Sequence, residues 1–262
     1  MSILSESEKG IARVTLSRPD RRNAFDAVMV EEVRQVFHTL GQDSSVRVIV
    51  LAGAGETFCA GADLRWMGPD RAVTALEGRQ DAERLLTMFR TIDECPCPVI
   101  GRIQGAAYGG GIGLIAVSDI AVAAADSTFA FSEVRLGLVP AVIAPFVVRK
   151  VGESFARRFC LTGESFSAAI ARQAGLIHEV VEPAGLDALV TALAEQMARV
   201  APQAARDTKA LLRRLSRVST EEAWEVCVDA NLRARLSMEA QEGCRAFRER
   251  RAPLWADPPE GE

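Results

Sequence analysis

The chain has 262 residues, a formal net charge of -4 at neutral pH and an apolar fraction of 48%. This composition is ordinary for a globular domain, and the length suits one α/β domain with or without a helical appendage. The slightly acidic balance gives no general affinity for nucleic acid or an anionic membrane. No apolar run approaches the roughly 20 residues of a membrane span, and the first residues lack the features of a secretory signal. We therefore expect a cytoplasmic protein with neither a nucleic-acid nor a membrane partner.

Residue types that bind metals or act as nucleophiles are few and scattered. The only two histidines, His38 and His178, belong to different segments. Among six cysteines only Cys95 and Cys97 lie close together, and no second pair completes a zinc site. We expect no metal and no Ser-His-Asp triad, and we interpret the cysteines as small buried residues or bystanders.

The first quarter of the chain alternates strand and helix patterns. Apolar residues alternate with polar ones over 11–16, which predicts a half-buried strand, and 18–23 is a turn. Asp26 is a plausible N-cap for a helix whose apolar positions follow the helical period to residue 40. Residues 46–51 are almost all aliphatic, which is typical of a strand buried on both faces.

The middle of the chain is organised around the stretch 105–113, where five of nine residues are glycine. Before it we expect a mobile loop over 65–80, which contains Gly-Pro, a helix over 81–93 and a strand over 98–103. A helix is expected from residue 114. Glycines let the backbone approach another molecule closely, and a helix start aims free N–H groups outward. The stretch therefore predicts a site for an anion or a developing oxyanion.

Beyond residue 118 short strands give way to helices. Strands are expected over 119–125, 128–131 and 179–182, with Ser167 capping a short helix. Three amphipathic helices are expected after Pro183, over 186–200, 203–218 and 220–250. Ser219 and Glu222 have the spacing of a capping box for the third helix. We place a boundary near residue 200, between a strand-rich part and a helical tail.

Three segments stand out chemically: the glycine-rich stretch, the small-residue run 59–63, and Glu133 in an otherwise apolar neighbourhood. Each alone has an ordinary structural explanation, as a turn, a helix cap or a partly buried acid. Together they predict two backbone N–H donors from separate segments with one proton-transferring acid beside them. Such a site stabilises an oxyanion while a proton moves.

Four motifs occur in order: RPDRRNA (18–24), FCAGADL (58–64), QGAAYGGG (104–111) and FSEVRLGLVP (131–140). In sequence and spacing they resemble the crotonase (enoyl-CoA hydratase/isomerase) superfamily from about residue 10 to the C-terminus. The resemblance implies an α/β fold, with a crotonase-like ββα spiral over 1–200 and a C-terminal helical region over 201–262. It also implies a homotrimer or a dimer of trimers.

The resemblance further implies an acyl-CoA substrate whose thioester oxygen accepts hydrogen bonds from the backbone amides of Ala62 and Gly110. Coenzyme A is then part of the substrate, and no separate cofactor is expected. The residues implied near the CoA moiety are Arg22, Ala24, Ala60, Asp63 and Leu64. Arg21 and Arg22 are candidates for the CoA phosphates, although adjacent arginines in a turn are as often merely solvated.

The sequence departs from the family at one catalytic position. Hydratases of this family usually carry two catalytic glutamates, one just after the triple glycine and one at the position of Glu133. The first position is Gly113 here. A single glutamate is also the arrangement of members that only shift a double bond, so this departure leaves hydratase and Δ3,Δ2-enoyl-CoA isomerase both open.

The residues around Glu133 resemble the methylglutaconyl-CoA hydratase subgroup, several of whose members have glycine at the first position. This resemblance favours reversible hydration of a 3-methylglutaconyl-CoA-like thioester, as in leucine degradation, with the substrate's second carboxylate helping to hold water near Gly113. Arg65, Arg71 and Arg79 are candidates to bind that carboxylate.

Two rivals come from other classes. Residues 111–116 fit the G-x-G-x-x-A dinucleotide pattern, but the helix that follows is too short for the usual crossover unit. An RNA-binding or scaffolding role is the second rival, yet the helix over 27–40 offers no basic face. The tail carries a basic set that we interpret as a solvated or subunit-contact face: Arg206, Lys209, Arg213, Arg214 and Arg217.

Overall fold

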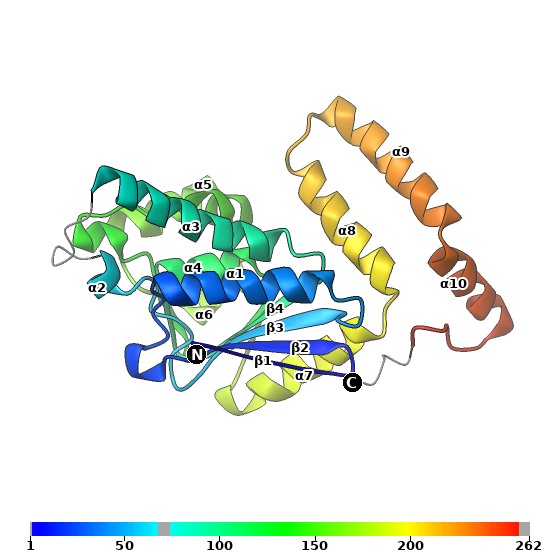
Figure 1. Cartoon of the computed structure of the whole chain (residues 1–262), viewed down its shortest axis with the longest axis horizontal. Helices are drawn as coiled ribbons and strands as arrows, with labels where there is room; N and C mark the ends of the chain where they lie inside the picture. Colours follow the sequence, from blue (N-terminus) through cyan, green and yellow to red (C-terminus); the bar gives the residue numbers. More distant parts are fainter. Residues whose placement is uncertain (1, 68–73, 257–262) are drawn as a thin grey trace.

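The computed structural model describes residues 2–67 and 74–256 of the chain, and its main feature is a six-stranded sheet (Figure 1). The strands lie in the order β1-β2-β3-β4-β6-β9. They are β1 Ile3–Glu8, β2 Ile11–Leu16, β3 Val48–Gly53, β4 Val99–Ile103, β6 Ile120–Ala124 and β9 Glu179–Val181. Only β1 and β2 pair antiparallel, and every other neighbouring pair is parallel. A parallel sheet requires cover on both faces, which explains why every residue of β3 is buried.

A second, smaller sheet forms the layer that contains the glycine-rich stretch. It has the order β5-β7-β8, with β5 Ala106–Tyr108, β7 Thr128–Ala130 and β8 Phe166–Ser167. Isolated parallel bridges from Cys59 to Ala107 and from Phe25 to Ala62 continue the layer toward the N-terminal part of the chain. Segments far apart in sequence are thereby brought side by side.

Helices cover both faces of the large sheet. They are α1 Ala27–Gln42, α2 Leu64–Met67, α3 Ala75–Asp93, α4 Gly110–Val117, α5 Ala144–Thr162, α6 Ala168–Gln173, α7 Leu186–Ala198, α8 Pro202–Leu215, α9 Thr220–Leu236 and α10 Met238–Glu249. Short 3₁₀ segments lie at Pro19–Arg21, Glu133–Leu136 and Pro183–Gly185. One core cluster lies between the sheet and α1, α3, α4 and α5, and a separate cluster lies under α7. Figure 1 shows α8 to α10 extending away from the sheet as an arm.

Several local predictions are confirmed. The half-buried strand over 11–16 is β2, and the side chain of Asp26 accepts a hydrogen bond from the amide of Met29 at the start of α1. Ser167 caps α6 in the same way, and Ser219 forms a capping box with Glu222 at the start of α9. In each case a short polar side chain satisfies an amide that the first helical turn leaves free.

Two predictions of element boundaries are wrong. The loop expected over 65–80 contains α2 and the first turn of α3, which Thr74 and Glu77 start with a capping box; residues 68–73 lie outside the described part. The single helix expected over 220–250 is two helices, because Ser237 is extended and caps α10 through the amide of Ala240. The boundary near residue 200 stays a prediction. Within the described ranges no helix combines the length and apolar character that a membrane span requires.

Candidate active site

The first amide of the site belongs to Ala62, which lies beside Phe25 in a parallel bridge. Phe25 donates its amide to the Gly61 carbonyl and accepts the Asp63 amide, each at 2.9 Å. The two hydrogen bonds of Phe25 thus go to the residues before and after Ala62. In a parallel bridge of this kind, the residue between them directs its own N–H away from the partner strand. The Ala62 amide therefore points away from Phe25 and is available to another acceptor.

The second amide belongs to Gly110, the first residue of α4. The first amides of a helix have no acceptor within the helix, and Gly109 provides no side chain to cap them. Neither the Gly110 nor the Ala62 amide donates to any acceptor within residues 2–67 and 74–256. The site thus has free donors from two separate chain segments.

These two segments are in close contact. A Cβ atom at Gly61, where φ is +87°, would lie 3.1 Å from the Gly110 nitrogen and 2.7 Å from the Tyr108 carbonyl oxygen. Only glycine suits both the backbone angle and this approach. The segment that contains Ala62 therefore lies against the start of α4, and the assignment of the two amides to an oxyanion site stays a prediction.

The carboxyl of Glu133 lies beside Gly109, at the same helix start. A Cβ atom at Gly109 would lie 2.9 Å from Glu133 Oε1 and 3.7 Å from Oε2. Oε2 is buried and finds no hydrogen-bond partner in the described part of the chain. Burial disfavours the charged form and raises the pKa of the Glu133 carboxyl above its ordinary value. An acid with a raised pKa is suited to both accepting and donating a proton.

Gly113 lies in the core one turn into α4. A Cβ atom at this position would lie 2.4 Å from Ile143 Cγ2 and 2.8 Å from Phe89 Cε1. The direction in which a second glutamate would leave the helix is therefore filled with apolar side chains. The same packing leaves no space on that side of Gly113 for the water and substrate carboxylate that we expected there.

The turn that supports Ala62 depends on two polar side chains. Asn23 is fully buried, and its Nδ2 donates to the carbonyls of Ala54 and Thr57 at 2.8 Å each. Arg18 reaches Asp63 Oδ2 at 3.3 Å and Asp26 Oδ2 at 3.0 Å. These contacts hold the turn after β2 against the segment that contains Ala62.

The residues expected near CoA gather around this turn. Arg22 is exposed with φ of +53°, and its carbonyl accepts the amide of Ala60 at 2.9 Å. Ala24 is buried, whereas Leu64 is 56% exposed at the start of α2. Asp63 already contacts Arg18 and accepts the amide of Arg65 at 3.0 Å, so part of its role is to cap α2. No ligand contact tests these assignments, and they stay predictions.

Four residues of the basic set in the tail contact the body of the chain. Lys209 forms an ion pair with Asp119 at 2.7 Å, and Arg213 forms one with Glu94 at 2.8 Å. Arg217 reaches Asp93 Oδ2 at 3.6 Å, and Arg206 donates to the carbonyl of Val46 at 2.9 Å. These contacts hold α8 against the sheet domain, so the interpretation of the whole set as a solvated or subunit-contact face is wrong for these four.

The dinucleotide alternative loses its support in the structure. A Cβ atom at Gly111 would lie 2.3 Å from the Cys59 carbonyl oxygen, and Gly113 packs against Phe89. Both glycines therefore serve close packing inside the chain, and neither leaves space for a pyrophosphate group. The helix that contains them ends at Val117, and β6 begins at Ile120.

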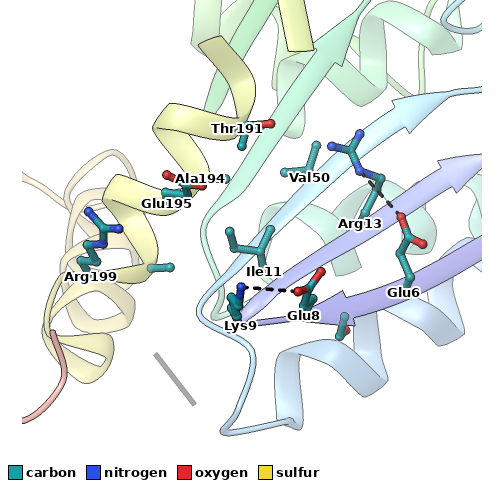
Figure 2. Close-up of a pocket in the computed structure, with 12 residues that line it drawn as sticks. Glu6, Glu8, Lys9, Ile11, Arg13, Val50, Thr191, Ala194, Glu195 and Arg199 are labelled. Atoms are coloured by element: carbon teal, nitrogen blue, oxygen red, sulfur yellow. Dashed lines mark ion pairs between the residues drawn. The ribbon is translucent and has the colours of Figure 1, made fainter. Parts of the chain in front are cut away.

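Other clusters offer no comparable chemistry. Within the described residues no group of metal-ligating side chains gathers, and Cys59, Cys95 and Cys97 are buried, whereas Cys244 is exposed. A hollow of about 900 Å³ lies between β1, β2 and α7. Figure 2 shows residues that line it, with the ion pairs of Lys9 with Glu8 and of Arg13 with Glu6. None of the residues assigned to the candidate site lines this hollow.

Sequence reasoning missed three residues that shape the site. Gly109 is the backbone position against which the Glu133 carboxyl rests, Asn23 holds the supporting turn, and Arg18 links that turn to Asp63. The motif containing Arg18 and Asn23 was visible in the sequence. What each side chain contacts depends on chain segments about 30 to 45 residues away.

Comparisons with known proteins show the family to which the chain belongs. The Enoyl-CoA hydratase/isomerase family model matches residues 6–258. A solved enoyl-CoA hydratase from Shewanella pealeana superposes with a TM-score of 0.92 at 37% identity, covering 97% of this chain and 96% of that one. The (E)-benzylidenesuccinyl-CoA hydratase of Thauera aromatica is 30% identical over 97% of this chain and 99% of its own. The peroxisomal Delta(3,5)-Delta(2,4)-dienoyl-CoA isomerase of Arabidopsis thaliana is 30% identical over 97% and 95%. The chain belongs to the enoyl-CoA hydratase/isomerase family and has its fold.

Proposed function

We propose that the chain catalyses reversible addition of water to a 2-enoyl-CoA. The thioester oxygen accepts hydrogen bonds from the amides of Ala62 and Gly110, and Glu133 is the single protein acid and base. One observation carries the proposal: within the described residues, two amides without an acceptor belong to segments that touch at the start of α4, where a Glu133 carboxyl oxygen also lacks a partner. The similar proteins from Shewanella pealeana and Thauera aromatica are both named hydratases, which supports it.

In the hydration direction, the Glu133 carboxylate takes a proton from water as the water oxygen forms a bond to C3 of the substrate. The π electrons move toward the thioester, and negative charge collects on its oxygen. The two amides stabilise that charge, and losing one such donor typically costs roughly 3–4 kcal/mol in the barrier. Protonated Glu133 then gives the proton to C2, which returns the carboxylate and completes the hydroxyacyl-CoA.

Replacing Glu133 by Gln tests this role. Gln has nearly the same shape but transfers no proton, so we expect turnover of crotonyl-CoA to fall roughly 100- to 10,000-fold. Binding of CoA thioesters, measured by calorimetry, should change little. Retained turnover in E133Q would remove Glu133 from the mechanism.

We further propose that the acyl group carries a second carboxylate, as in 3-methylglutaconyl-CoA. The name of the similar Thauera aromatica enzyme includes a succinyl-CoA unit, in which one carboxyl group forms the thioester and the other is free. Among the candidate arginines, Arg65 lies in α2, two residues after Asp63, whereas Arg79 already forms an ion pair with Glu83 at 2.8 Å. Arg71 lies outside the described residues. Arg65→Ala should raise KM about tenfold for 3-methylglutaconyl-CoA and leave KM for crotonyl-CoA unchanged, because a charge-assisted hydrogen bond is lost only for the former.

The second candidate is a shift of the double bond without water. It is favoured by the filled space at Gly113, which leaves Glu133 as the one acid at the site, and by the similarity to the Arabidopsis thaliana isomerase. An assay of crotonyl-CoA, 3-methylglutaconyl-CoA and a 3-enoyl-CoA in ¹⁸O-labelled water separates the two. Hydration predicts label in the product, whereas reaction of the 3-enoyl compound alone, without label, would identify an isomerase.

We also propose that the chain assembles as a homotrimer or a dimer of trimers. The arm formed by α8 to α10 exposes large apolar side chains, among them Trp224 at 68% and Phe247 at 86%. Contiguous exposed apolar surface is typical of an interface. A second copy of the chain is the partner that the family resemblance favours.

A further inference from the structure

The helix that supplies the Gly110 amide has unequal ends. Helix α4 is only eight residues long, and its N-terminal end has no side-chain cap, which leaves the amides free for a ligand. Its C-terminal end is fixed by three side-chain hydrogen bonds. Ser118 Oγ donates to the Leu114 carbonyl at 2.9 Å, and Lys150 Nζ donates to the carbonyls of Ile115, at 3.4 Å, and Ser118.

We propose that Lys150 is a positioning residue for the active site, whose ammonium group holds the C-terminal end of α4 and thereby fixes Gly110 beside Ala62 and Glu133. The inference rests on the proposed function. A helix of eight residues is a rod about 12 Å long, so a tilt at one end displaces the other. A displacement of about 1 Å at the reacting groups can cost roughly 100-fold in rate.

Lys150 also connects α4 to the segment that contains Glu133. It lies in α5, and the residue before this helix, Ile143, packs against Gly113. The chain from Glu133 to Lys150 therefore contacts α4 beside its start, in its middle and at its end. One continuous segment therefore positions both the carboxyl of Glu133 and the helix that presents the Gly110 amide.

The surrounding charges show that Lys150 acts on carbonyl groups rather than in an ion pair. Among the described residues, no carboxylate forms an ion pair with it. Asp119, from the segment before β6, is occupied by Lys209 Nζ of α8 at 2.7 Å. Asp93 of α3 is occupied by Arg149 of α5 and by Arg217, which reaches it at 3.6 Å.

His178, which precedes β9, adds no charge to this neighbourhood at neutral pH. Its Nδ1 accepts the amide of Ala121, and its pKa is lowered mainly by burial, with a contribution from Lys150.

Burial also lowers the pKa of Lys150 to about 8. The carboxylates of Asp119 and Asp93 act to raise this pKa, whereas the positive charges of Arg149 and Lys209 lower it further. A partly buried ammonium that lacks a carboxylate partner is costly, and within the described residues the hydrogen bonds of Lys150 Nζ go to the end of α4. A cation at a helix C-terminus also interacts favourably with the helix dipole.

The test compares Lys150→Met, which keeps the length of the side chain without its charge, with Lys150→Arg. Lys209→Met is the matched control, because it removes a neighbouring, partly buried cation whose polar contacts within the described residues are with Asp119 and the Cys97 carbonyl, not with α4. For K150M we expect kcat with crotonyl-CoA to fall about tenfold, and KM to change less than twofold because the CoA contacts lie on other segments. K150R should keep most of the wild-type kcat. K209M should lower the melting temperature and leave kcat unchanged.

Amide hydrogen exchange provides a readout that does not depend on activity. The peptide 105–117 should exchange faster in K150M and at the wild-type rate in K209M. If K150M does not fold, the alkaline limb of wild-type kcat takes its place: kcat should fall as Lys150 loses its proton near pH 8, and K150R should shift that limb upward.

Three results would overturn the proposal: wild-type kcat in K150M, an equal loss of kcat in K209M, or a wild-type kcat that stays flat from about pH 7 to pH 9.5. A wild-type chain that turns over no CoA thioester would reject the proposed function instead. The exchange measurement would then still decide whether Lys150 fixes α4.

Discussion

Gly109 occupies a position at which a single added methyl group would contact the carboxyl of Glu133, the proposed acid. Its φ is +49°, and a Cβ atom there would lie 2.9 Å from Glu133 Oε1. Gly109→Ala should therefore displace the carboxyl and lower kcat about 100-fold, because the proton-transferring group is moved out of reach. Steady-state kinetics with crotonyl-CoA measure the effect.

Gly152→Ala is the matched control for Gly109. Gly152 has φ of +78°, so its replacement brings comparable backbone strain, but nothing lies within 4 Å of the added Cβ atom. This variant should lose stability and keep its kcat. Equal losses of kcat in both variants would show that strain, not contact with Glu133, is responsible.

The carboxyl of Glu133 should destabilise the folded chain at neutral pH. Burial raises its pKa in the folded state above that in the unfolded state. The stability that protonated Glu133 contributes is then full below the unfolded pKa and is lost as the pH rises through the folded pKa. E133Q, which stays neutral, should therefore melt at a higher temperature than the wild type at pH 7 and at nearly the same temperature at pH 4. Calorimetry at both pH values measures the melting temperatures. An equal difference between E133Q and the wild type at pH 4 and at pH 7 would contradict this prediction.

At the scale of elements, the turn after β2 is held by Asn23 more than by the helix that follows. Asn23 donates to three buried or partly buried carbonyls, at Ala54, Thr57 and Phe58. Asn23→Ala leaves them without this donor and should cost about 3 kcal/mol in the free energy of unfolding. Asp26→Ala, which removes the N-cap of α1 and the ion pair with Arg18, should cost about 1.5 kcal/mol. Urea unfolding of both variants gives the comparison, and a smaller loss in N23A than in D26A would contradict this account.

An element could be predicted where a pattern among neighbouring residues in the sequence marks it. Strand β3 and the cap of α1 follow from a run of aliphatic residues and from one Asp, and both were predicted. Strand β1 was missed because five of its six residues are exposed, so no apolar alternation marks it. The start of α3 had a readable signal in Thr74 and Glu77, which the nearby Gly-Pro pair obscured.

The candidate site was predictable as a set of motifs but not as a geometry. The sequence pointed to Ala62, Gly110 and Glu133 because their motifs resemble those of a family. The contact between Gly109 and Glu133, and the packing of Phe89 against Gly113, join segments about 24 residues apart. No local pattern encodes such contacts, since they depend on how the two sheets and α3 pack together.

At the scale of the whole molecule, the arm has two faces with different chemistry. Ion pairs of Lys209 and Arg213 hold α8 to the sheet domain, whereas α9 presents Trp224, Val228 and Leu232 to solvent. Replacing both Trp224 and Val228 by Glu should dissociate the proposed trimer, because charges at the core of an interface are strongly unfavourable. Light scattering coupled to size-exclusion chromatography measures the mass.

Glu225→Lys on the same helix is the control for that experiment, since Glu225 is exposed and already charged. It should leave the mass unchanged. A wild-type chain that elutes as a monomer at micromolar concentration would contradict the proposed assembly.

The most direct test of the central claim is a crystal structure of the chain with 3-hydroxybutyryl-CoA bound. The account predicts that the thioester oxygen lies about 3 Å from the amide nitrogens of both Ala62 and Gly110, with a Glu133 carboxyl oxygen within hydrogen-bond distance of the 3-hydroxyl group. A thioester oxygen that contacts neither amide, or a substrate bound away from Glu133, would contradict it.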